Sequence, residues 1–321
     1  MQKKTIYLAG GCFWGAEHFF QQLGGILSTQ TGFANGNTEN PTYKEVYTDT
    51  TGFAETVKID YDADRMPLGK LLNLFFMIID PVSLNKQGED EGTRYRTGIY
   101  YTDPAELPVI QAVYAEQEAK VSKEMISAGE EPKKLAVEVE ELRNWYSAED
   151  YHQDYLNKNP QGYCHLPLKL FVYAKMLSEM ELILGDEPDV IARMSNAVAM
   201  IHERLHFFWT GFYIVKDNLE GNDKELVLGP FQGPSACFRI RKGRGVCGTS
   251  WAKDETQVVP DVEEFPGHIA CSSLSRSEIV VPVHDSEGNF MAVLDIDSKE
   301  LGTFDKIDKD WLEMAVRLIY R

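Results

Sequence analysis

Cys12 is the residue of this chain best placed to do chemistry. It stands in LAGGCFWGAEHFF (residues 8–20), after two glycines and directly before a helix-like segment. The thiolate is the reactive form of cysteine, and the unpaired N–H groups of a helix N-terminus lower the pKa of a thiol placed there. The glycines permit a tight turn, and Phe13 and Trp14 put apolar surface beside the sulfur. We therefore expect a nucleophile next to a small apolar pocket; the alternative is a buried structural cysteine.

The composition limits the class of protein. The chain has 321 residues, is 43% hydrophobic and carries a net charge of −18. This length predicts two domains with sizeable cores. Both halves are acidic, and no basic patch for a nucleic-acid backbone stands out. Because the sequence shows neither a long apolar run nor a signal-peptide cleavage site, we expect a cytoplasmic protein that binds neither nucleic acid nor membranes.

The chain has five cysteines, which are Cys12, Cys164, Cys237, Cys247 and Cys271. In a reducing compartment cysteines seldom form structural disulfides, so these residues indicate catalysis, redox chemistry or metal binding. No C-x-x-C pair occurs among them, and their spacing fits no zinc pattern. We expect neither a bound metal nor a bound cofactor.

The first half alternates strand-like and helix-like segments. The strand segments alternate apolar and polar residues, and the helical ones repeat apolar residues with the helical period. We expect strands at 4–10, 55–62, 95–101 and 135–142, helices at 12–23, 66–81 and 104–129, and a short helix within 147–164.

The pattern changes near residues 165–168. Helices followed by an antiparallel-looking sheet and a last helix predict a second self-contained domain. The fold class is therefore α+β, with domains at residues 1–164 and 165–321. In the second domain we expect helices at 168–185, 188–205 and 306–319, and strands at 207–215, 225–231, 236–241, 257–262, 278–285 and 290–298.

The segment GGCFWGAE around Cys12 resembles the A-type peptide-methionine sulfoxide reductases, a family that acts on the S epimer. Further matches follow in order over residues 5–164: NPTYKEV, TGFAETV, DPVSLNKQGEDEGTRYRTGIYY, AEDYHQDYL and NPQGYC. So many ordered blocks are far more specific than one short motif. The resemblance implies a two-layer α/β reductase domain that acts on methionine sulfoxide, both protein-bound and free.

The resemblance implies a role for each matched residue. Cys12 is the nucleophile, and Glu55 in GFAET is the acid, held protonated by an apolar surround that raises its pKa. Tyr43 and Tyr95 donate hydrogen bonds to the sulfoxide oxygen. Taken singly, each tyrosine or carboxylate would be a surface or packing residue. The spacing of the whole set favours the catalytic interpretation.

The same family pattern extends to substrate binding and recycling. Asp90 orients the substrate, and Phe13 and Trp14 hold its methyl group. Attack leaves Cys12 as a sulfenic acid and releases methionine. Cys164, in the Gly-containing GYC loop, matches the recycling cysteine that forms a disulfide with it, and thioredoxin is the expected external reductant and partner.

Three positions depart from the family pattern. Phe53 and Ile79 stand where the family usually has histidine, which removes two polar groups near the site. We expect these changes to alter the proton network and substrate preference but not the reaction class. Tyr47 stands where some members carry another cysteine, so a three-thiol relay is not expected.

Three interpretations compete for the cysteines of the second half. A metal site would use His268 and Cys271, but the spacing fits no zinc pattern. A dinucleotide site would use Gly243, Gly245 and Gly248, which spell G-x-G-x-x-G, although no parallel βαβ context surrounds them. The third interpretation is redox chemistry.

The segments ACFRI, GRGVCG, DVEEFPGHIACSS, SRSEIVVP and VLDIDS resemble the GAF-type free methionine-(R)-sulfoxide reductases, from about residue 168 to the end. The resemblance implies a GAF-like domain with an antiparallel sheet and flanking helices. It also implies that Cys271 is the nucleophile and Cys237 the resolving thiol, while Cys247 assists or forms an alternative disulfide. A generic GAF ligand sensor would not need three thiols.

The resemblance also implies a pocket for a free amino acid. Glu278, Asp295 and Asp297 hold the ammonium group and the sulfoxide oxygen, and Trp209 and Tyr213 wall the pocket. A free amino acid carries an ammonium group that peptide-bound methionine lacks, and buried carboxylates suit it. The alternative is that the two aspartates merely end a strand at a turn.

The sequence thus predicts a bifunctional thiol-dependent reductase whose substrates are oxidised proteins and free methionine sulfoxide. Its first half reduces the S epimer, and its second half reduces the R epimer of free methionine. Two alternatives remain. The second half is a redox-sensing or ligand-binding regulator of the first, or the whole chain is a thiol peroxidase.

Overall fold

The computed structural model describes residues 1–269 and 272–320. Its contacts divide the chain into two compact units, Met1–Ala174 and Lys175–Arg321, which confirms the two-domain α+β prediction. The first unit continues ten residues beyond the predicted boundary after Cys164. Phe171, in helix α6 (Leu168–Leu184), packs edge-on against His18 with ring centroids 4.7 Å apart.

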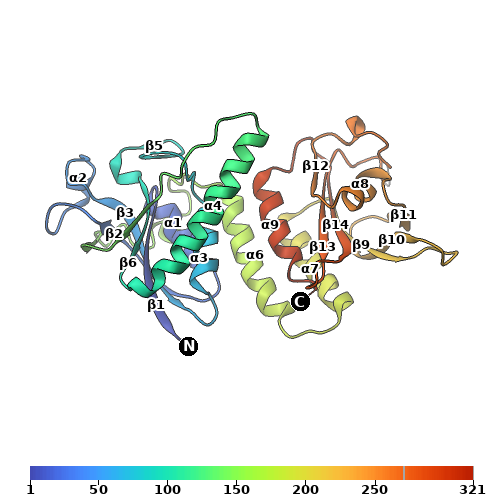
Figure 1. The fold of residues 1–321 in the computed structure, drawn as a ribbon, viewed down its shortest axis with the longest axis horizontal. Helices are drawn as coiled ribbons and strands as arrows, with labels where there is room; N and C mark the ends of the chain where they lie inside the picture. The colour runs from blue at the N-terminus through green and yellow to red at the C-terminus, as the bar shows by residue number, and fades with distance from the viewer. Residues whose placement is uncertain (270–271, 321) are drawn as a thin grey trace. The chain divides into compact units, whose positions relative to one another are not determined.

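The first unit is built on a six-stranded sheet in the order β7-β6-β1-β3-β2-β8 (Figure 1). Strands β6 and β7 are parallel, and every other neighbouring pair is antiparallel. The strands are β1 (Lys3–Gly10), β2 (Ile26–Ala34), β3 (Ala54–Asp62), β6 (Thr97–Tyr101), β7 (Glu138–Glu141) and β8 (Trp145–Ser147). A separate hairpin pairs β4 (Lys86–Gln87) with β5 (Asp90–Glu91).

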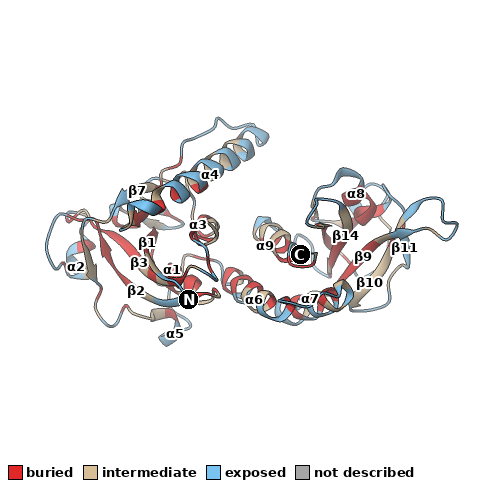
Figure 2. Ribbon diagram, turned by 60° about the horizontal axis from the view of Figure 1, so that its bottom comes forward, coloured by how far each residue is buried: buried red, intermediate tan, exposed pale blue. Residues whose placement is uncertain are grey.

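Helices cover this sheet because their apolar residues must be buried. Helix α1 (Phe13–Gln21) packs on β1, β2 and β3 and buries Phe19 and Phe20 completely. Helix α3 (Leu68–Phe76) packs against α4 (Leu107–Ser127), most of which is exposed (Figure 2). The short helices are α2 (Tyr43–Val46), α5 (Tyr155–Lys158), η1 (Thr93–Tyr95) and η2 (Pro104–Glu106).

The second unit contains a six-stranded antiparallel sheet with flanking helices, as predicted. Its strand order is β11-β10-β9-β14-β13-β12. The strands are β9 (Trp209–Asp217), β10 (Lys224–Gln232), β11 (Arg239–Ile240), β12 (Gln257–Val259), β13 (Ser277–His284) and β14 (Phe290–Ser298). The helices are α7 (Val190–Leu205), α8 (Gly245–Lys253) and α9 (Lys306–Val316), and η3 (Val262–Glu264) is a short 3-10 turn.

Both faces of this sheet are buried. Val280 and Val293 pack with Trp251 of α8. Ile279 and Val281 point to the opposite face, since side chains alternate along a strand, and both are fully buried. Helices α7 and α9 also pack on the sheet, α7 on β9 and β10 and α9 on β13.

The G-x-G-x-x-G motif opens helix α8, but the dinucleotide interpretation is wrong. The preceding strand β11 has two residues and pairs antiparallel with β10, so the parallel βαβ unit of a dinucleotide fold is not formed here. The glycines serve packing instead. A Cβ on Gly248 would lie 2.4 Å from the carbonyl oxygen of Arg241, and Gly245 has a φ of +62°.

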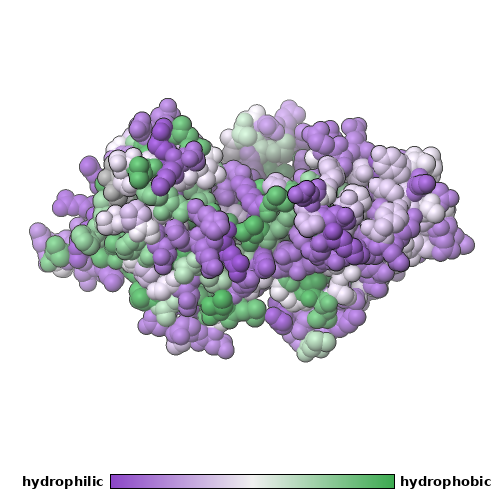
Figure 3. All heavy atoms as spheres, turned by 180° about the vertical axis from the view of Figure 1, so that it is seen from behind, coloured by the Kyte–Doolittle hydropathy of each residue, from purple (hydrophilic) through white to green (hydrophobic). Residues whose placement is uncertain are grey.

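Much of the surface is polar. The face drawn in Figure 3 is mostly hydrophilic, with hydrophobic side chains in smaller patches. Within the described ranges, every helix is too short or too polar to cross a membrane.

We predict that Gly248→Ala destabilises the second unit by about 3 kcal/mol, because the new methyl group would overlap backbone that cannot rotate away. Gly243→Ala is the matched control in the same motif. Its φ is +76° but nothing lies within 4 Å of a Cβ there, so only a backbone cost of about 1 kcal/mol is expected. Urea denaturation of the intact chain measures both, and equal losses would contradict this explanation of the glycines.

Candidate active sites

Cys12 lies at the junction between β1 and helix α1, where it is the N-cap residue. The turn before it requires glycine: Gly11 has a φ of +78°, and a Cβ there would lie 2.7 Å from the Cβ of Gln87. The Trp14 backbone N–H donates a hydrogen bond to the Cys12 sulfur. The thiol is nevertheless buried, with 5% of the residue exposed.

The predicted lowering of the Cys12 pKa is wrong. Burial raises the pKa well above the ordinary value of the thiol, and the charge of the neighbouring Glu55 carboxylate raises it further. The hydrogen bond from Trp14 at the helix N-terminus acts in the opposite direction but is the weaker effect. The free thiol is therefore the stable form of Cys12 at neutral pH.

Glu55 lies beside this thiol on strand β3. Its Oε2 accepts a hydrogen bond of 3.1 Å from the Phe13 backbone N–H, the first N–H of helix α1. Its Oε1 is buried and has no hydrogen-bond partner within the described part of the chain. Burial raises the pKa of Glu55 to about 8, although the Phe13 hydrogen bond and the charge of Arg94 oppose this. The carboxyl group is thus mostly protonated at neutral pH, with one oxygen unused.

Tyr43 and Tyr95 meet at the same place from different elements. Tyr43 begins helix α2, and Tyr95 ends the turn η1. Burial raises the pKa of both hydroxyl groups, and the charge of Glu55 raises each of them further. Both residues therefore remain hydrogen-bond donors beside the carboxyl group and the thiol.

Aromatic rings line the approach to Cys12. The Phe13 ring stacks on Tyr43 at 6.3 Å, and the Trp14 ring stacks on Tyr155 at 3.8 Å. The Trp14 Nε1–H also donates to Nδ1 of His152 at 3.1 Å. Sequence reasoning missed His152 and Tyr155, although both stand in the matched block AEDYHQDYL.

Asp90 and Cys164 also lie in this region. Asp90, on β5, shares a hydrogen bond with the hydroxyl of Tyr163. One polar atom each of Asp90, Cys12 and His165 lies within 4.8 Å of the others. Cys164 is a half-buried free thiol, and its Sγ lies 3.1 Å from where a Cβ on Gly15 would be. Helix α1 can approach the GYC loop this closely only with glycine at that position.

The three departures from the family pattern are structural. Phe53 is buried and packs edge-on against Tyr146 at 5.8 Å. Ile79 lies against Gly10, where an added Cβ would lie 3.3 Å from the Ile79 Cγ2. The Tyr47 ring lies under the Arg94 guanidinium at 4.1 Å. Each position thus supports the surrounding packing with an apolar or stacking contact.

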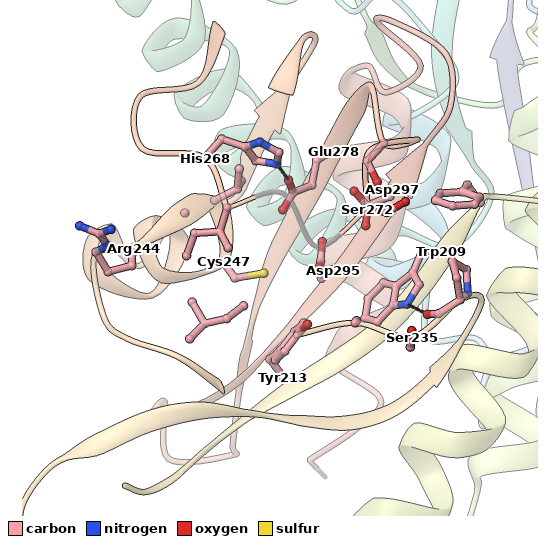
Figure 4. A pocket seen from close by; sticks show the side chains of 18 residues that line it. Trp209, Tyr213, Ser235, Arg244, Cys247, His268, Ser272, Glu278, Asp295 and Asp297 are labelled. Atoms are coloured by element: carbon pink, nitrogen blue, oxygen red, sulfur yellow. Dashed lines mark hydrogen bonds and ion pairs between the residues drawn. The ribbon is translucent and has the colours of Figure 1, made fainter. Parts of the chain in front are cut away.

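The second unit holds a pocket between α8 and the sheet (Figure 4). Cys247 is buried on α8, and its sulfur points toward the strands that carry Tyr213 and Asp295. The Cys247 thiol shares a hydrogen bond with the Asp295 carboxyl group. Strand β9 supplies Trp209 and Tyr213 to the lining, β13 supplies Glu278, and β14 supplies Asp295 and Asp297.

Three carboxyl groups crowd this pocket. Glu278 pairs directly with Asp297 across β13 and β14, and Asp295 lies two residues before Asp297 on the same strand. Burial raises the pKa of Asp297 to about 6, and burial with mutual repulsion raises the pKa values of Glu278 and Asp295 well above the ordinary range. His268 approaches Glu278 at 3.8 Å. The turn interpretation of the two aspartates is wrong, because both lie within β14 and line the pocket.

The two aromatic residues of β9 hold a loop over the pocket. The Trp209 Nε1–H donates to the Pro234 carbonyl, and the Tyr213 hydroxyl donates to the Cys237 carbonyl, each at 3.0 Å. Cys237 is disulfide-bonded. Cys271, the predicted nucleophile, lies outside the described residues.

Two groups of side chains offer the ligand types of a transition metal. They are Cys12 with Asp90 and His165, and Cys247 with Glu278 and Asp295, each bringing one atom per residue within 4.8 Å of the others. Both groups coincide with residues predicted to react or to bind substrate. That the protein works without a bound metal remains a prediction.

A family model of peptide methionine sulfoxide reductases matches residues 4–181. The chain belongs to this family. It is an oxidoreductase that reduces methionine sulfoxide. The peptide methionine sulfoxide reductase MsrA of Lachnoclostridium phytofermentans is 51% identical over 172 residues, which cover 54% of this chain and 98% of the relative. The MsrA of Clostridium perfringens is also 51% identical, over 51% of this chain and 99% of the relative.

The rest of the reductase chain has structural neighbours among free methionine-R-sulfoxide reductases. The structure of that enzyme from Neisseria meningitidis, in complex with its substrate, is 49% identical. The likeness covers 46% of this chain and 85% of the other, with a TM-score of 0.43.

We predict that Cys12 reacts with iodoacetamide with a pH midpoint above 9, because burial and the Glu55 charge both oppose formation of its thiolate. Mass spectrometry of the tryptic peptide that contains Cys12 measures labelling against pH, and the same peptide in the urea-unfolded chain is the control. A midpoint below 7, as for a thiol activated by a helix N-terminus, would contradict this account.

Proposed function

We propose that the first unit reduces the S epimer of methionine sulfoxide, in proteins and as the free amino acid. The observation that carries this proposal is the protonated Glu55 carboxyl group, buried beside the Cys12 thiol with one oxygen unused. A sulfoxide sulfur resists attack until its oxygen is protonated or strongly hydrogen-bonded. Glu55 supplies the proton, and Tyr43 and Tyr95 supply hydrogen bonds to the same oxygen.

The first step then needs no outside reactant. As the Cys12 sulfur attacks the substrate sulfur, the Glu55 proton goes to the substrate oxygen and the thiol proton replaces it on Glu55. The oxygen ends on Cys12 as a sulfenic acid, and methionine leaves. The apolar rings of Phe13 and Trp14 hold the substrate methyl group, and Asp90 orients the rest.

The second step resets the nucleophile. Cys164, whose sulfur lies against Gly15 in the same region as Cys12, attacks the sulfenic acid. A disulfide forms and water leaves. Thioredoxin then reduces the Cys12–Cys164 bond by thiol–disulfide exchange. Both thiols are free in this structure, which fits the state that begins the cycle.

We propose that the second unit reduces the R epimer of free methionine sulfoxide. Its pocket buries three carboxyl groups, Glu278, Asp295 and Asp297, whose repulsion an ammonium group would relieve. Peptide-bound methionine has no such group. In this proposal Cys271 is the nucleophile and Cys237, on the loop held over the pocket, is the resolving thiol.

Cys247 fits the assisting role in that unit. Its sulfur faces the pocket and shares a hydrogen bond with Asp295, so it lies where a second disulfide partner or a positioning group would be needed. Trp209 and Tyr213 close the pocket around the substrate side chain.

Separated epimers test both proposals in one protein. We predict that Cys12→Ser abolishes reduction of the S epimer and leaves the R epimer unaffected, because each unit has its own nucleophile. Cys271→Ser should do the reverse, and only for the free amino acid. The measurement is methionine formation by the full chain with a thioredoxin system.

Two outcomes would contradict this assignment. If the wild-type chain fails to reduce the free R epimer, the second unit is a sensor or regulator instead. If peroxide is consumed much faster than either sulfoxide, the chain is a thiol peroxidase. The Cys12→Ser, Cys271→Ser double variant is the background control for both measurements.

A further inference from the structure

His165 directly follows the recycling cysteine and has no part in the mechanism above. Its ring lies over the first turn of helix α1. A Cβ on Gly11 would lie 3.3 Å from Nε2, and one on Gly15 would lie 3.2 Å from Nδ1. The turn of the β4–β5 hairpin also lies against His165, because a Cβ on Gly88 would lie 3.7 Å from the His165 Cβ. The imidazole is thus held between the hairpin and the helix N-terminus.

The ring nitrogens of His165 are buried but unused. Neither makes a hydrogen bond of ordinary geometry with any described residue, although the Gly10 carbonyl is close enough to raise the pKa of the ring slightly. Burial has the larger effect and lowers that pKa, so the ring is neutral at neutral pH. A neutral imidazole can accept a proton at its free nitrogen. Burial makes this ring a weaker base than an exposed histidine, and the charge of Asp90 acts in the opposite direction.

The ring also borders both reacting sulfurs. One of its nitrogens, the Cys12 Sγ and a carboxylate oxygen of Asp90 lie within 4.8 Å of one another. His165 also lies close to Cys164 over Gly15. A Cβ on Gly15 would lie 3.1 Å from both the His165 Cε1 and the Cys164 Sγ. No other histidine of the first unit is adjacent in sequence to either cysteine.

The recycling step needs such a group. Burial raises the pKa of the Cys164 thiol, so it carries its proton at neutral pH and is a poor nucleophile. The sulfenic acid on Cys12 must lose hydroxide, which leaves easily only as water. A single group near both sulfurs can remove the first proton and supply the second.

We propose that His165 carries the proton of the recycling step. It takes the proton from Cys164 as that sulfur attacks Cys12, and it gives this proton to the departing hydroxyl group. The S–S bond forms, the S–O bond breaks and one water leaves, with no further oxidant or reductant. Asp90, beside the ring, stabilises the transient imidazolium. This inference rests on the proposed function of the first unit.

A single-turnover experiment tests His165 directly. The full-length variants His165→Asn and His165→Gln react with the S epimer, without thioredoxin and with a chelator to exclude metal binding. Methionine release reports the first step, and loss of the Cys164 thiol, followed in its tryptic peptide, reports disulfide formation. We expect methionine release at the wild-type rate and disulfide formation slowed about 100-fold. Dimedone should then trap sulfenic acid on Cys12.

The matched control is His18→Asn, a half-buried histidine of helix α1 that packs on Phe171. It should leave both steps unchanged. The inference is overturned if the His165 variants form the disulfide at the wild-type rate, or if methionine release slows equally, since the residue would then serve the first step or the fold. If the wild-type chain itself releases no methionine, the proposed function has failed, and the inference fails with it.

Discussion

The first unit depends on keeping a carboxyl group out of water beside a thiol. Burial is the largest influence on Glu55 and outweighs both the hydrogen bond from Phe13 and the charge of Arg94. The same burial keeps the proton on Cys12, and each group in its ionised form would raise the pKa of the other. In the proposed first step the Glu55 proton passes to the sulfoxide oxygen, and the Cys12 thiol proton replaces it on the carboxyl group.

Burial also raises the pKa values of carboxyl groups in the second unit, where they line a pocket. Glu278, Asp295 and Asp297 cannot all ionise while they are buried together, so an incoming ammonium group would find carboxyl groups that gain a partner on ionising. Peptide substrates have no such cation. The antiparallel register that pairs Glu278 with Asp297 thus connects the fold of this sheet with the proposed preference for the free amino acid.

The sequence predicted the family and much of the fold, while the roles of the site residues stay predictions. Alternation and period identified most strands and helices, and the family blocks identified Cys12 and Glu55. Strand β8 is three residues long and helix α8 opens on glycines, so each depends on tertiary packing that no local pattern reveals. The predicted direction of the Cys12 pKa shift was wrong because a helix N-terminus can be recognised in the sequence, whereas burial cannot. His165 was missed because only the fold brings it close to both Cys12 and Cys164.

The protonation state of Glu55 tests the central claim most directly. Carbon-13 NMR of the labelled carboxyl carbon, assigned by its loss in Glu55→Gln, gives the pKa of that group in the intact chain. The account predicts a midpoint of about 8, with the carboxyl group protonated at neutral pH. A midpoint near the ordinary value of 4.5 would leave the sulfoxide oxygen without its acid and would contradict the account.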